Sequence, residues 1–101
     1  MEFKHTMVFD TTEELEQGFT YGNKELSIFI VDTALENLKT ELQTIPVVSI
    51  STNDDDLIYD IMIDRPDMID TLEQNLESME RYEEYERCQK ITDALHYLRN
   101  N

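Results

Sequence analysis

The sequence predicts an α+β fold, in which a small antiparallel or mixed sheet is packed by helices on one face and the chain ends in an antiparallel α-helical hairpin. Residues 2–9 alternate between two faces, and over residues 57–64 one face is apolar while the other also carries Asp60 and Asp64, as expected for strands with one covered face. In the last third of the chain, apolar residues follow a helical period, lose phase once and then resume it. A chain of 101 residues is expected to form a single domain, so both parts should share one core.

The first predicted elements are a strand and a short helix. The alternation over Glu2–Phe9 predicts the strand. Thr11 is followed three residues later by Glu14, which is the spacing of a capping box and predicts a helix through Gln17. The segment 18–22 contains both glycines of the chain and is predicted to be a loop or turn.

Residues 24–31 leave two alternatives. The β-branched and aromatic content of Leu26–Val31 favours a strand, with a helix beginning near Asp32. A helical spacing of apolar residues that continues to Ile45 favours instead one long helix over about Lys24–Gln43. We expect a strand followed by a helix, with the long helix as the alternative.

A β-hairpin is predicted over about residues 47–63. Its strands are Val47–Ser51 and Leu57–Ile63, and an acidic turn joins them. In the second strand one face is apolar, and the other alternates apolar with acidic residues. This pattern indicates an antiparallel sheet with one face covered and the other partly exposed to solvent. Residues 1–66 therefore form the α/β portion, in the order strand, helix, strand, helix and two strands.

Two apolar stripes with the same internal spacing mark the C-terminal third. One continuous helix would need apolar residues at positions that hold charged residues, from Glu83 to Asp93. The stripes can face each other only if the chain folds back near Tyr82, which predicts an antiparallel helical hairpin over residues 67–99. The stripes are Ile69, Leu72, Leu76 and Met79 in the first helix, and Cys88, Ile91, Leu95 and Leu98 in the second.

The last predicted helix follows a pattern of an aromatic residue, an acid, and small and aliphatic residues. The residues that carry it are Tyr85, Glu86, Cys88, Ile91, Asp93, Leu95 and Leu98, with Leu72, Leu76 and Met79 in the preceding helix. This pattern resembles the UVR motif, a short helical hairpin of excision-repair proteins and of some regulators of Clp proteases. The resemblance covers about residues 68–99. The chain departs from it at Gln89, where a second small residue is usual, and at Thr92, where arginine is usual. The resemblance implies protein–protein contact through the hairpin, and no nuclease or ATPase activity.

The charge of the chain restricts its expected partners. Lys and Arg number 8 against 23 Asp and Glu, for a formal net charge of −15. Such a surface repels nucleic acids and anionic lipids, so we expect no direct nucleic-acid contact and no membrane contact. It attracts a protein partner with a basic surface. No stretch of the sequence indicates a signal peptide or a membrane span, and a cytoplasmic protein is expected.

Carboxylates recur at helical spacing beside the first apolar stripe. They are expected to lie on one face of the first hairpin helix, where they form either a docking surface or a solvated face that only aids solubility. Two tyrosines near the predicted bend are candidate aromatic anchors. The expected protein-binding residues are Asp70, Glu73, Glu77, Glu80 and Glu84 for the charge, and Tyr82 and Tyr85 for the anchors.

The sequence contains no motif that we would assign to catalysis, to a metal or to a cofactor. Cys88 is the only cysteine, and no cysteine or second histidine lies at ligand spacing from either histidine in sequence. We therefore expect a non-enzymatic interaction module: an adaptor or inhibitor, of the kind that a phage uses to modulate a host machine, or a DNA mimic that acts on a nucleic-acid-binding protein. The alternative is a structural homo-oligomer, for instance a homodimer, that assembles through the apolar face of the hairpin.

Overall fold

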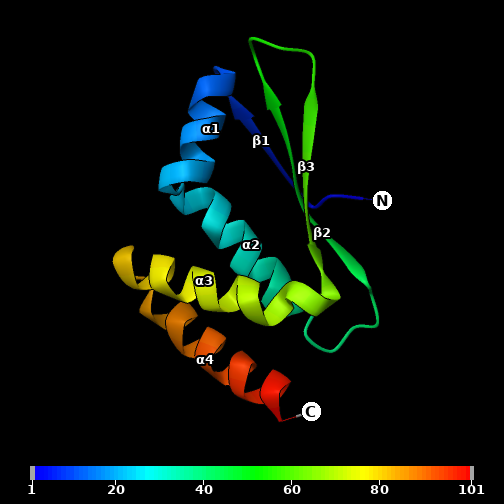
Figure 1. Ribbon diagram of the computed structural model, residues 1–101, viewed down its shortest axis with the longest axis vertical. Helices are drawn as coiled ribbons and strands as arrows, with labels where there is room; N and C mark the ends of the chain where they lie inside the picture. The colour runs from blue at the N-terminus through cyan, green and yellow to red at the C-terminus, as the bar shows by residue number, and fades with distance from the viewer. Residues whose placement is uncertain (1, 101) are drawn as a thin grey trace.

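The computed structural model describes residues 2–100 and confirms the predicted α+β class. It contains a three-stranded mixed sheet and four α-helices, of which the last two form a helical pair (Figure 1). In chain order the elements are β1 (His5–Phe9), α1 (Thr12–Tyr21), α2 (Lys24–Glu36), β2 (Thr44–Thr52), β3 (Ile58–Asp64), a 3-10 turn (Arg65–Asp67), α3 (Met68–Arg81) and α4 (Tyr85–Arg99).

The sheet has the strand order β1-β2-β3. β1 runs parallel to β2, and β2 runs antiparallel to β3, so the predicted β-hairpin is confirmed. The register of β2 on β3 shifts between Pro46 and Val48, and both Val47 and Val48 are buried. Such a bulge explains how two consecutive residues reach the core side of the sheet. It also accommodates Pro46 within β2, where the lack of an N–H would weaken a regular ladder.

The expected strand over residues 24–31 is wrong, because these residues begin helix α2. Asn23 caps this helix, since its side-chain oxygen accepts a hydrogen bond from the Leu26 amide at 2.9 Å. The alternative of a long helix from Lys24 is right about the start, but the helix ends at Glu36 and not near Gln43. The helical spacing therefore outweighed the strand propensity of this segment.

The early end of α2 is stabilised by a residue from another part of the chain. The guanidinium of Arg65 donates hydrogen bonds to the carbonyls of Asn37, Thr40 and Leu42, at 2.8–2.9 Å. These carbonyls belong to the connection between α2 and β2 and lie outside regular structure. Because an unpaired carbonyl is costly when it is shielded from water, Arg65 stabilises this irregular connection.

Helix α1 is longer than expected and has two caps. It continues to Tyr21, so Gly18 lies inside the helix and the predicted loop shrinks to the residues around Gly22, whose φ is 94°. The Thr11 side chain accepts a hydrogen bond from the Glu14 amide, as the capping-box spacing indicated. The Asp54 carboxylate, from the β2–β3 turn, accepts hydrogen bonds from the amide and hydroxyl of Thr12. The hairpin tip is thereby joined to the start of α1.

All four helices lie on one side of the sheet (Figure 1). Helix α2 packs against β2, α3 packs against α2, and α4 packs against both helices as the outermost element. One core holds residues of both the α/β portion and the helical hairpin. Half of the residues of the two apolar stripes are buried in it, namely Leu72, Met79, Ile91 and Leu95, and the others are partly buried against it. Among residues 2–100, no helix has the length and apolar character needed to cross a membrane.

Candidate protein-binding surface

Four of the five predicted acidic-stripe residues form an exposed acidic face on α3. The helix turns its apolar side toward α2 and α4, where Leu72 and Met79 are fully buried. Each carboxylate follows an apolar-stripe residue by one position, which is about 100° around the helix, so the carboxylates flank the buried side and reach solvent. We call the α3 acidic face the set of Asp70, Glu73, Glu77 and Glu80, all of which are exposed.

The members of the α3 acidic face differ in their partners. Glu73 forms an ion pair with Arg99 of α4 at 2.8 Å, and both side chains are about half exposed. Within residues 2–100, the carboxylates of Asp70, Glu77 and Glu80 make neither a hydrogen bond nor an ion pair. These three charges are therefore fully offered to solvent or to a partner.

Glu84 was predicted to continue the stripe, and this placement is wrong. Helix α3 ends at Arg81, and Glu83 adopts a left-handed backbone conformation with a φ of 59°. A residue in that conformation reverses the chain after a helix. Glu84 consequently lies at the start of α4 and is not part of α3. Its side chain is half-buried and forms an ion pair with Arg87 at 2.5 Å. Its charge is already used within the chain.

The two predicted aromatic anchors are placed differently. Tyr82 is half-buried against the core, and its hydroxyl lies beside Gly22, so it is mainly a packing residue. Tyr85, at the start of α4, is 66% exposed. Of the two tyrosines, Tyr85 is thus the one that presents its ring to a partner.

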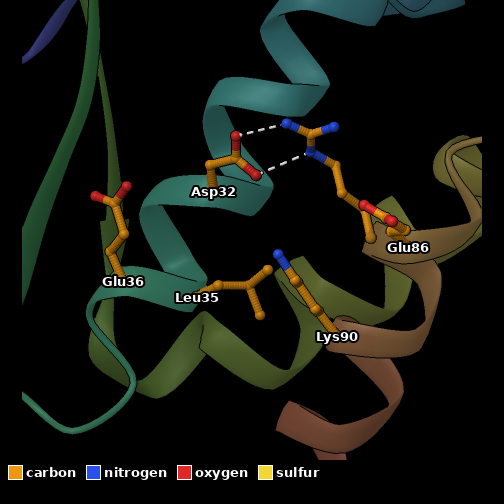
Figure 2. A pocket seen from close by; sticks show the side chains of 6 residues that line it. Asp32, Leu35, Glu36, Glu86 and Lys90 are labelled. Carbon is orange, nitrogen blue, oxygen red and sulfur yellow. Dashed lines mark hydrogen bonds and ion pairs between the residues drawn. The ribbon is translucent and has the colours of Figure 1, made fainter.

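An ion pair that the sequence did not indicate joins the hairpin to the rest of the chain. Arg87 of α4 donates two hydrogen bonds of 2.9 Å to the carboxylate of Asp32 on α2 (Figure 2). This pairing, together with the carboxylate of Glu84, raises the pKa of Arg87. A spacing of four residues, as between Glu83 and Arg87, favours a local pair on one helix, but the local partner of Arg87 is Glu84. Periodicity along one helix could not identify a partner that is 55 residues away.

A cleft of about 420 Å³ lies between α2 and α4 beside this ion pair (Figure 2). In Figure 2 the side chain of Lys90 points into the cleft, near Leu35. Acids and bases around the cleft nearly compensate one another in charge, so it does not concentrate a field of one sign. Its lining residues are Asp32, Leu35, Glu36, Glu86, Arg87 and Lys90.

Two observations bear on metal binding and on the reactivity of the thiol. Across residues 2–100, no group of three or more His, Cys, Asp or Glu side chains is arranged to hold a metal ion. Burial, and secondarily the charge of Glu80, raise the pKa of the Cys88 thiol. A raised pKa lowers the thiolate fraction at neutral pH, which makes this thiol a poor nucleophile.

Comparison of the chain with protein-family models, with curated proteins and with solved structures finds no match. The hairpin expected from the resemblance to the UVR motif is present over α3 and α4, while kinship with that motif stays a prediction. The fold and the surface together define a small α+β protein with an acidic helical hairpin packed on the helical side of its sheet.

Proposed function

We propose that this protein is a non-enzymatic, cytoplasmic interaction module that binds a protein partner with a basic surface through the α3 acidic face. The observation that carries the proposal is the exposure of Asp70, Glu77 and Glu80 without a partner among the described residues, on a helix whose other side is fixed in the core. A rigid row of free carboxylates attracts cationic side chains and accelerates their encounter. The exposed ring of Tyr85 adds apolar contact area at the end of the hairpin.

The spacing of the carboxylates bears on whether the module mimics DNA. From Asp70 to Glu80 there are ten steps along the helix, so the four charges span about 15 Å, with about 5 Å between neighbours. Duplex DNA carries one charge per about 1.7 Å along its axis. The α3 acidic face is therefore several times less dense in charge than a duplex. An adaptor or inhibitor that binds a basic protein surface agrees better with this density than a copy of the phosphate track.

Burial of the hairpin's apolar residues within the chain argues against the alternative of self-assembly through the hairpin. That alternative needs an apolar stripe that is free to meet a second copy. The central stripe residues Leu72, Met79 and Ile91 are instead buried within the chain itself. A homodimer through these residues would first require α4 to leave α2 and α3, at the cost of their shared burial.

The experiment that tests the proposal reverses two free charges, with Glu77→Lys and Glu80→Lys in one variant. The full chain is immobilised as bait and incubated with cell lysate at about 50 mM salt, where Debye screening is weak. Bound proteins are identified by mass spectrometry. We expect the wild type to capture basic proteins, and this capture to fall at least tenfold in the variant and at about 500 mM salt.

A matched control separates local charge from total charge. Glu13→Lys with Glu16→Lys makes the same change in net charge on the exposed side of α1. We expect this control to retain most of the capture. Equal capture by the wild type and the α3 variant would refute the proposed role of the α3 acidic face. An equal loss of capture in the α3 variant and the α1 control would show that capture depends on net charge alone.

A further inference from the structure

The face of the sheet that points away from the helices is uncovered in the described chain (Figure 1). Along β3, the residues on this face alternate apolar and acidic: Ile58, Asp60, Met62 and Asp64. Ile58 is 68% exposed and Met62 is 45% exposed, and Val8 on β1 is 65% exposed on the same face. Ser51 lies between Val8 and Ile58 in the register, so the apolar residues form part of one surface.

The outer edge of β3 is also free. β3 pairs only with β2, and no other hydrogen bond to the backbone of residues 58–64 occurs among the described residues. Proteins commonly protect such an edge with charged side chains, especially lysine, with proline, or with a bulge in the edge strand. β3 contains neither lysine nor proline, and the register shift of the hairpin lies on β2. The only charged residues of β3 are Asp60 and Asp64, so its edge opposes an acidic strand but can accept a basic one.

We infer that β3 accepts an extended segment of a partner protein as a fourth strand, and that one face of this segment, made by every second residue, alternates basic and apolar residues. Its basic residues would lie opposite Asp60 and Asp64, and its apolar residues opposite Ile58 and Met62. Cross-strand pairs of opposite charge and of apolar residues stabilise such pairing, while backbone hydrogen bonds supply the common part of the affinity.

Both acids are able to form these pairs. Asp60 accepts a hydrogen bond from Ser49 at 2.9 Å, and Asp64 accepts one from Thr44 at 3.3 Å. Each hydrogen bond comes from the neighbouring strand β2, on the side of β3 away from its free edge, and each carboxylate remains exposed. A carboxylate has about four acceptor positions, so the outer side of each group is still able to bind a cation.

The charges favour a basic partner over a second copy of this chain. If two copies of β3 paired antiparallel, Asp60 or Asp64 of one strand would lie opposite or diagonal to an acid of the other. Like charges at these positions are destabilising. Two chains of net charge −15 also repel each other at long range. Charge complementarity therefore selects the occupant.

This inference goes beyond the proposed function, because it concerns β3 and not α3. Its test uses the full chain labelled with ¹⁵N and a synthetic peptide that repeats Lys-Thr-Val-Thr over the length of β3. We expect amide shift changes centred on residues 58–64. The variant Asp60→Asn with Asp64→Asn should weaken binding roughly three- to tenfold at low salt. Glu16→Gln with Glu41→Gln, two exposed acids elsewhere, makes the same change in net charge and should leave binding nearly unchanged.

Peptides with methylated backbone nitrogens test the strand geometry. One peptide carries the methyl groups on its threonines and another on its lysines and valines, so that each blocks one edge of the strand. We expect one of them to lose binding and the other to retain it. Retained binding by both would overturn strand addition.

Three other outcomes would also overturn the inference. The first is the absence of shift changes. The second is shift changes confined to α3, which would leave the proposed function standing. The third is a concentration-dependent change on β3 without peptide, which would identify a second copy as the occupant. We expect the variant with Glu77→Lys and Glu80→Lys to bind the peptide normally. Such binding would support this inference even if the α3 acidic face proved to have no role in partner capture.

Discussion

Replacing Asp32 by Asn should loosen α4 from α2 without changing the fold. The substitution keeps the size and shape of the side chain but removes the charge that Arg87 meets with two hydrogen bonds of 2.9 Å. It is therefore a direct test of whether the hairpin is fastened to the remainder of the chain by this pair as well as by apolar packing.

The size of the effect follows from the partial burial of the pair. Hydrogen bonds to charged groups contribute about 1.5–3 kcal/mol when buried, and exposed ion pairs contribute about 0–1 kcal/mol. The side chains of Arg87 and Asp32 are 31% and 35% exposed, and Glu84 still neutralises Arg87 after the change. We expect a loss of about 1–2 kcal/mol in the free energy of unfolding, and a fall of roughly 5–12 °C in Tm for a domain of this size.

The assay is urea unfolding, followed by circular dichroism, in a double-mutant cycle with Arg87→Met. A coupling energy of about 1 kcal/mol is expected between the two positions. Glu36→Gln is the matched control, because this carboxylate also lies on α2 but forms only an exposed contact of 3.7 Å with Lys4. Its effect should stay within about 0.5 kcal/mol. A coupling energy below about 0.3 kcal/mol between Asp32 and Arg87 would refute the reasoning and assign the attachment of α4 to apolar packing alone.

Two further predictions concern the core and the hairpin tip. Leu72→Ala removes a fully buried side chain at the contact of α3 with α2 and α4 and should cost about 2–5 kcal/mol in urea unfolding; a cost under about 1 kcal/mol would show that the contact is loose. The amide of Thr12 lowers the pKa of Asp54 below its ordinary 3.8. A depressed pKa in the folded state adds stability above pH 3.8, and this stability is lost as the pH falls through the folded-state pKa. Asp54→Asn should therefore make the free energy of unfolding fall less steeply with acid. The measurement is urea unfolding between about pH 5 and about pH 2. An unchanged dependence on pH would show that the Thr12–Asp54 contact has no energetic role.

The helical hairpin was predictable because its signal is local. The phase loss between the two apolar stripes requires a reversal near Tyr82, and the chain does reverse there, with Glu83 in a left-handed conformation. The alternation along β3 likewise separated its two faces correctly, since strand periodicity needs no information on the partner strand.

The errors arose where distant contacts decide between local alternatives. Leu26–Val31 has strand propensity, yet it forms the helix that β2, α3 and α4 all pack against. The early end of that helix depends on Arg65, which binds the carbonyls that follow it. Glu84 kept the spacing of the acidic stripe but not its surface, because helical periodicity stops where the helix does.

The sequence by itself determined the class of the fold, the buried faces of β3 and the hairpin, and the strongly acidic character of the surface. Each of these depends on periodicity or composition, which are properties of neighbouring residues. Only the tertiary structure decided that the apolar stripes close within the chain, that Arg87 pairs with Asp32, and that the outer face and edge of β3 remain free. These features depend on which distant elements meet, and that choice is made by packing of the whole core and not by any one segment.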